Sequence, residues 1–98
     1  MSNTFYSQYV DHCLRFYVRH SNPKFYRESD KNNWIACDTA LKEFSDNEKE
    51  IFFIIYKDGN VLSDNIYHVA RCKGVSQDVI WKSVNELRCK IAKKRGLL

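Results

Sequence analysis

Basic side chains are concentrated in the last third of the chain. Residues 64–98 carry eight basic and three acidic groups, a net charge of +5, whereas residues 28–63 have a net charge of −4. Such a distribution favours a nucleic acid or another acidic partner. The same segment contains amide, carboxylate, ammonium and indole groups at spacings that share one face of a helix, where side chains of these types can meet the edges of bases. These residues are Gln77, Asp78, Trp81, Lys82 and Asn85.

The spacing around Gly74 predicts two helices joined by a tight turn. Ala70 is small enough for two helices to approach closely, Gly74 can end the first helix in the left-handed conformation, and Ser76 can cap the second. A helix-turn-helix has these features, and its second helix, here about residues 76–95, enters the major groove of DNA with its N-terminal turns. The opposite face of that helix carries an apolar stripe of Ile80, Val84, Leu87 and Ile91.

Two longer motifs occur in the second half of the chain. They are Phe44-Ser45-x-x-Glu48-Lys49-Glu50-Ile51-x-x-x-Ile55-Tyr56 and Val69-Ala70-x-x-x-Gly74-Val75-Ser76-x-x-x-Ile80. Together they resemble region four of the sigma-70 family of transcription initiation factors, and phage and mobile-element regulators built on that module are also similar. The likeness covers roughly residues 40–95. It implies a supporting helix followed by a helix-turn-helix that reads promoter DNA.

The resemblance also implies roles for individual side chains. By position, Gln77, Asp78, Trp81, Lys82 and Asn85 contact bases, and Ser76, Arg71, Lys73 and Arg88 lie near phosphates. The family has large apolar residues where this chain has Lys73 and Ser83, and Cys72 and Val84 are the neighbours that can fill those places. Residues 1–39 match no region of a sigma factor.

Two of these assignments have an alternative. Trp81 borders the apolar stripe, a position that is also typical of a tryptophan packed against the N-terminal helices. The run Lys93-Lys94-Arg95 is a candidate for phosphate contacts, but cations are also common at a solvated helix end, where they complement the helix dipole.

The remaining patterns predict three more helices. They also predict where the helix before Gly74 begins. Apolar residues recur at helical spacing over residues 5–18, and Ser29 or Asp30 can cap a second helix. Ser45-x-x-Glu48 is a capping box that begins a third helix, expected to end at Gly59-Asn60. Asn65 or Asp64 can cap a short fourth helix over residues 66–73. The apolar stripe of the second helix consists of Trp34, Cys37, Leu41 and Phe44.

The third helix has an alternative. Residues 51–56 are apolar on nearly all sides and are also compatible with a buried strand that turns at Asp58-Gly59. The capping box favours the helix. With three glycines and one proline, the chain has too few turn signals for an all-β fold. We therefore expect one all-α domain over residues 1–98 with about five helices, in which residues 1–44 cover the core and residues 45–98 form the sigma-like unit.

Several classes of protein do not fit the sequence. The longest apolar run is too short to span a membrane, no export signal is present, and four cysteines without close pairing indicate free thiols, so we expect a cytoplasmic protein without membrane contact. His68 with Cys72, and His12 with Cys13, are too few ligands for zinc. No catalytic or cofactor-binding motif occurs, and we expect neither an enzyme nor a cofactor.

The expected function is therefore DNA binding in transcriptional regulation, in a bacterium or phage, with double-stranded DNA as the partner. Two alternatives stay open. In one, the sigma-like unit is a protein-interaction module that binds RNA polymerase or a regulator without reading DNA, and in the other it binds RNA. Dimerisation also stays open, since residues 1–27 suit either the arm of a homodimer or a cover for the core.

Overall fold

In the computed structural model, residues 6–20, 24–25 and 27–97 are described. Within these residues the chain forms five helices and no strand, so the predicted all-helical class is confirmed. The alternative of a buried strand over residues 51–56 is wrong, because all of them lie within one helix. The helices are α1 (Ser7–Arg19), α2 (Glu28–Leu41), α3 (Asp46–Lys57), α4 (Leu62–Lys73) and α5 (Gln77–Lys94).

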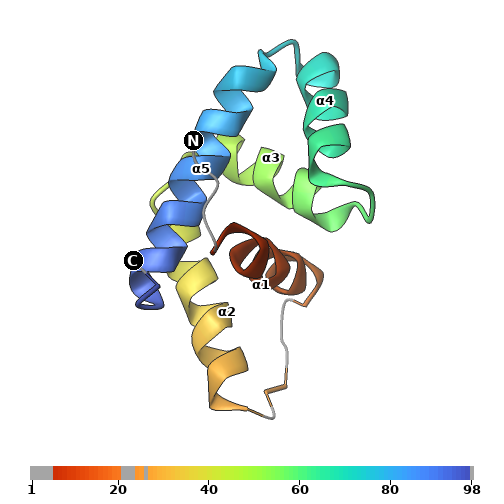
Figure 1. Cartoon of the computed structure of the whole chain (residues 1–98). Coiled ribbons are helices and arrows are strands. Elements are labelled where there is room, and N and C mark those ends of the chain that lie inside the picture. Colours follow the sequence, from red (N-terminus) through yellow and green to blue (C-terminus); the bar gives the residue numbers. More distant parts are fainter. Residues whose placement is uncertain (1–5, 21–23, 26, 98) are drawn as a thin grey trace.

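The longest helix, α5, organises the molecule. It contacts α1, α2 and α4, while α1 also packs on α2 and α3, and α3 packs on α4. Figure 1 shows α1 and α2 beside the C-terminal half of α5, and α3 and α4 toward its N-terminal half. The turn between α4 and α5 lies at the end of the molecule farthest from α2 (Figure 1). The first turns of α5 are therefore left clear of the two N-terminal helices.

The apolar side chains of all five helices form one buried cluster. Burial of a large aliphatic side chain contributes about 2 kcal/mol, so this cluster is the main force that holds α5 in place. The stripe predicted on the last helix is confirmed, since each of its members is at most 2% exposed: Ile80, Val84, Leu87 and Ile91. The stripe of α2 is buried at Cys37 and Leu41 and continues to the buried Phe44, whereas Trp34 lies at the edge of the core.

The second helix begins two to three residues earlier than expected. Arg27, in an extended conformation, is the residue at the N-terminal boundary, and the helix starts at Glu28. Neither Ser29 nor Asp30 acts as the N-cap, because both lie within the first turn. Acidic side chains are favourable there, next to the unpaired N–H groups of the helix. Asp30 also forms a hydrogen-bonded ion pair with Arg27 at 3.3 Å.

The capping box at the start of α3 is confirmed. The Ser45 Oγ accepts a hydrogen bond from the backbone N–H of Glu48 at 3.2 Å, and Glu48 Oε1 accepts one from the backbone N–H of Ser45 at 3.1 Å. These two bonds satisfy donors that have no partner within the helix. The start of α3 was therefore predictable from four consecutive residues.

The junction between α3 and α4 differs from the prediction. The third helix ends at Lys57 and has no left-handed glycine cap, because Gly59 does not have a positive φ. The segment just after the helix is held from α1 instead: Arg15 donates to the carbonyl oxygens of Asp58 at 2.6 Å and Asn60 at 3.0 Å. A guanidinium carries several donors in one plane, which suits it to bind two carbonyl oxygens at once.

The fourth helix begins at Leu62, one turn before the expected start. Asp64 and Asn65 therefore do not cap it, and its N-terminal boundary is Val61, without a side-chain cap. Asn65 faces the interior, is 3% exposed and donates to the carbonyl oxygen of Ile55 at 2.8 Å. Its amide also lies 3.3 Å from the carbonyl oxygens of Asp58 and Asn60. One buried amide thus binds the end of α3 to the start of α4.

Candidate nucleic-acid interface

The turn between α4 and α5 has the local geometry that the sequence predicted. Gly74 adopts the left-handed conformation, with φ of 68° and ψ of 32°, and its N–H donates to the carbonyl oxygen of Ala70. The N–H of Val75 donates to the same oxygen at 3.1 Å. Ser76 caps α5, since its Oγ accepts from the N–H of Asp78 at 3.1 Å. The small side chain of Ala70 is buried between the helices.

Four of the five side chains predicted to meet bases share the exposed part of α5. Gln77, Asp78, Lys82 and Asn85 are all exposed. Because helical residues three and four positions apart lie on one face, Asp78, Lys82 and Asn85 form a continuous polar ridge opposite the apolar stripe. The geometry brings together amide, ammonium and carboxylate groups on one exposed face of α5.

Trp81 is not part of this exposed face. It is partly buried and packs against the core cluster, in agreement with the alternative reading of the sequence. The guanidinium carbon of Arg88 lies 5.7 Å from the centroid of the indole ring, within the range of a cation–π contact. Trp81 therefore flanks the polar ridge and supports Arg88 rather than projecting from the surface.

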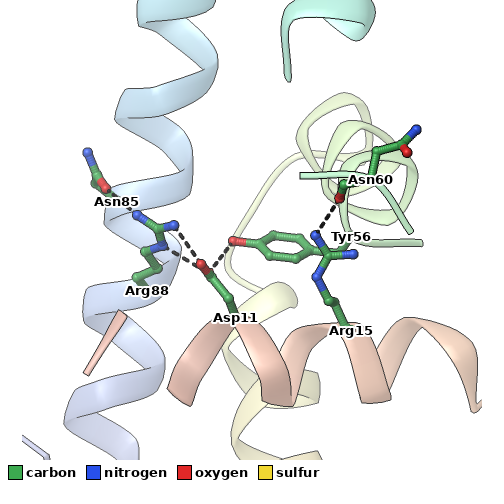
Figure 2. A network of polar contacts seen from close by, with 6 residues as sticks. All are labelled: Asp11, Arg15, Tyr56, Asn60, Asn85 and Arg88. Atoms are coloured by element: carbon green, nitrogen blue, oxygen red, sulfur yellow. Dashed lines mark hydrogen bonds and ion pairs between the residues drawn. The ribbon is translucent and has the colours of Figure 1, made fainter. Parts of the chain in front are cut away.

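Arg88 faces the interior, which corrects its placement near phosphate. Its Nε and Nη2 donate to the two carboxylate oxygens of Asp11 on α1, at 2.9 and 2.7 Å. The two side chains are only 14% and 21% exposed. The hydroxyl of Tyr56, on α3, donates to the same carboxylate at 2.8 Å (Figure 2). The remaining Arg88 nitrogen, Nη1, donates to Asn85 Oδ1 at 3.2 Å.

The charges of this network are stabilised by one another. Burial is the largest single effect and acts to lower the pKa of Arg88, but the hydrogen bonds and charge interactions with Asp11 and Tyr56 together outweigh it, and the pKa is raised. Burial, followed by the negative charge of Asp11, raises the pKa of Tyr56 well above its ordinary value. The tyrosine is therefore a neutral donor and the arginine a cation at all ordinary pH values.

The cations expected to contact phosphates differ in whether they already bind another side chain of the protein. Arg71 donates to the hydroxyl of Tyr67 at 3.0 Å on the exposed face of α4, and Lys73 is paired with Glu50 at 3.0 Å. Among the described residues, Lys82 and Lys93 form no ion pair. They are eleven residues apart, and thus lie on the same face of α5 about 16 Å apart along its axis.

The basic C-terminal end of α5 is partly neutralised. Glu43 forms ion pairs with Lys90 at 3.0 Å and Lys94 at 3.2 Å, and these hydrogen bonds hold the pKa of its carboxyl below the ordinary value. Arg95 donates to Asn33 Oδ1 at 2.6 Å. In this run, Lys93 is the residue that points to solvent without such a contact in the described part of the chain.

Lys73 and Ser83, the two residues at which the sequence resemblance predicts apolar side chains, both bind α3. Lys73 pairs with Glu50, and the hydroxyl of Ser83 donates to Glu48 Oε2 at 3.2 Å. Of the two neighbours expected to fill those places, Val84 is buried but Cys72 is exposed, so the expectation for Cys72 is wrong.

The sequence reasoning missed two exposed apolar residues beside the ridge. Val79 is 58% exposed and Val75 is 38% exposed. Together with Ile51 of α3 they border a pocket of about 120 Å³ that Glu48 and Ser83 also line. Val79 is an apolar residue at a helix position outside the buried stripe, which periodicity alone does not distinguish from an ordinary surface valine. Val75 lies in the turn before α5, where helical periodicity gives no signal.

Other kinds of site find little support in the part of the chain that the structure describes. No group of three histidine, cysteine or acidic side chains converges there to hold a metal ion. His68 and Cys72, the pair with helical spacing, are both exposed. None of the helices in residues 6–20, 24–25 and 27–97 is both long enough and apolar enough to cross a membrane.

Comparison of the chain with protein-family models, with curated proteins and with solved structures finds no significant match. The side chains and their geometry are therefore the basis for any functional assignment.

Proposed function

We propose that this chain is a DNA-binding transcriptional regulator in which α4 and α5 form a helix-turn-helix. In this proposal α5, about residues 76–95, lies in the major groove and acts in the cytoplasm of a bacterium or an infected bacterial cell. The observation that carries the proposal is the exposed polar ridge on a serine-capped helix that follows a left-handed Gly74. A helix of this kind fits the width of the major groove.

The side chains of the ridge have the chemistry for direct readout of bases. Asn85 and Gln77 offer amides, and Lys82 offers an ammonium that can bond to guanine O6 and N7. Asp78 can accept a hydrogen bond from the amino group of cytosine. Its carboxylate repels phosphate, which disfavours any arrangement of α5 on the DNA that brings Asp78 close to the backbone. Ser76 remains a proposed neighbour of phosphate at the helix N-terminus, where backbone N–H groups favour anions.

The proposed phosphate contacts come from both ends of the helix pair. Arg71 and Lys73 precede the turn on α4, and Lys93, with Lys94 and Arg95, lies about four and a half helical turns beyond the start of α5. Because several of these cations already bind acidic or amide groups, only about three phosphates are expected to be neutralised on binding. The logarithm of the association constant should then fall with the logarithm of salt concentration with a slope of about −3.

The test is fluorescence anisotropy of labelled duplex DNA titrated with the protein at several salt concentrations. Sites are first selected from a randomised duplex library. Lys82→Ala and Asn85→Ala should each weaken binding to the selected site by about 1–3 kcal/mol. The matched control is Lys31→Ala, which removes an exposed lysine of α2, a helix outside the proposed interface. Absence of duplex binding at low salt, or equal losses for the control, would contradict the proposal.

A second candidate function has its own support in the exposed Val75 and Val79. Apolar residues beside a shallow pocket favour contact with a protein, so the alternative is a module that binds RNA polymerase without reading DNA. Such a complex should form in the absence of DNA. Val79→Ser should weaken it while leaving duplex binding unchanged, and the opposite pattern would assign Val79 to the DNA interface.

A further inference from the structure

We propose that Arg88 and Asp11 are positioning residues for Asn85, and that Asn85 consequently reads bases as a hydrogen-bond donor. This inference rests on the proposed DNA-binding function, because it concerns how one side chain of that interface is presented. It names two residues that do not themselves touch DNA. It also assigns a chemical preference to one position of the target site.

The orientation of the Asn85 amide follows from its partner. A guanidinium has donors and no acceptor, so the atom that lies 3.2 Å from Arg88 Nη1 is the amide oxygen. The amide nitrogen is then directed away from Arg88, as Figure 2 shows. The oxygen is already engaged within the protein, and the exposed part of the amide is its NH₂ group.

Arg88 is itself held in a fixed geometry. Asp11 binds it at two points, Nε–Oδ1 at 2.9 Å and Nη2–Oδ2 at 2.7 Å, and the ring of Trp81 lies 5.7 Å from its guanidinium carbon. Asp11 is in turn bound by the hydroxyl of Tyr56, whose side chain is fully buried. A two-point contact fixes the plane of a guanidinium as well as its position. The orientation of a surface amide is therefore set from the core.

The orientation has a consequence for base recognition. An asparagine that reads adenine uses both ends of its amide, with the oxygen accepting from N6 and the nitrogen donating to N7. Here the oxygen is bound by Arg88, which disfavours this pairing. The free NH₂ group instead suits bases that present only acceptors to the major groove, which are guanine with O6 and N7 and thymine with O4. Adenine also has an acceptor at N7, but its neighbouring amino group needs the amide oxygen that Arg88 already binds. We therefore expect guanine or thymine at the base contacted by Asn85.

The experiment compares sites selected from a randomised duplex library by the unmodified protein and by variants. Asn85→Ala should abolish the preference for guanine or thymine, over cytosine or adenine, at one position of the strand that Asn85 contacts, a loss of about tenfold in discrimination. Arg88→Lys and Asp11→Asn should weaken the preference at that same pair and at no other. Combining Arg88→Lys with Asn85→Ala should add no further loss there.

Asn85→Asp tests the donor role more directly. Asn85 is exposed, so this substitution should not impair folding. The aspartate keeps an acceptor for Arg88 but presents an oxygen in place of the NH₂ group. The preference at that base pair should change to cytosine or adenine, whose amino groups are donors in the major groove. The control is Val10→Ala, which destabilises α1 next to Asp11 without removing a member of the network and should leave the preference unchanged.

Three outcomes overturn the inference, and they are distinct. If the unmodified protein binds no duplex, the proposed function fails and base reading by Asn85 fails with it. If the unmodified protein selects a site but the Arg88 and Asp11 variants, shown to be folded by circular dichroism, keep its preference at the Asn85 pair, only the positioning role fails. If the Asn85→Asp variant keeps the preferred base of the unmodified protein at that position, the proposed donor role fails while DNA binding stays in place.

Discussion

Arg88 of α5 and Asp11 of α1 are 77 residues apart in the chain and form a two-point ion pair near the centre of the molecule. The pair joins the N-terminal helix to the helix that carries the exposed polar ridge. It also involves the core, because Tyr56 of α3 donates to the same carboxylate. One carboxylate thus ties three helices together, and the polar ridge depends on α1 although α1 lies outside it.

We expect Asp11→Ala to lower the free energy of unfolding by about 2 kcal/mol. The substitution leaves the mostly buried Arg88 cation without its partner and removes the acceptor of the Tyr56 hydroxyl. Residual exposure of the pair allows water to offset part of this loss. Urea denaturation followed by circular dichroism measures the change.

The matched control is Asp30→Ala, which breaks the ion pair with Arg27. That arginine is 75% exposed, and exposed pairs contribute about 0–1 kcal/mol. Equal effects of the two substitutions would show that the Arg88 pair is as solvated as a surface pair, contrary to the structure.

Features set by neighbouring residues could be predicted from the sequence. The capping box at Ser45, the left-handed Gly74 and the serine cap of α5 each depend on a few adjacent residues, and the buried stripe of α5 follows from helical periodicity. In these cases the local sequence and the final packing agree.

The polar residues that face inward could not be predicted in this way. An arginine on a helix, such as Arg88, is ordinarily solvated. An asparagine near the start of a helix, such as Asn65, ordinarily caps it. Their partners come from α1 and from the end of α3. Only the packing of helices distant in the chain brings these groups together, and no local pattern encodes that packing.

Gly74→Ala should lower the free energy of unfolding by about 1 kcal/mol. The φ of Gly74 is 68°, a conformation in which a Cβ is strained, although open space surrounds the position. The control is Gly59→Ala, where φ is not positive and the added Cβ meets only ordinary contact with Arg19. Thermal or urea unfolding of both variants gives the comparison. A larger loss in the Gly59 variant would contradict the assigned turn geometry.

The four thiols should differ in reactivity toward an alkylating reagent. Cys72 is exposed and should react first, whereas Cys13 and Cys37 are buried. Burial raises the pKa of both buried thiols, which lowers the amount of reactive thiolate. We expect their alkylation to be slower than that of Cys72 by a factor on the order of one hundred, because it requires local opening. Mass spectrometry of quenched samples measures the alkylation rates. The rates of the four cysteines should become similar when the protein is unfolded in urea. Rapid labelling of Cys37 in the folded protein would contradict the described core.

Asn65→Asp should be among the most destabilising substitutions at about pH 7, with a loss of about 3–5 kcal/mol. The change replaces a buried NH₂ donor by a carboxylate oxygen that faces the carbonyl oxygens of Ile55, Asp58 and Asn60. Burial and these acceptors should raise the pKa of the new carboxyl in the folded state. A raised pKa means that the folded state binds the proton more tightly, so the variant should regain stability, relative to the unmodified protein, as pH falls from about 7 to about 5. Urea denaturation at several pH values measures this gain.

Asn47→Asp, on the exposed first turn of α3, is the control and should change stability by less than about 0.5 kcal/mol without that pH dependence. If the Asn65 variant were as stable as this control, its amide could not be the link between α3 and α4.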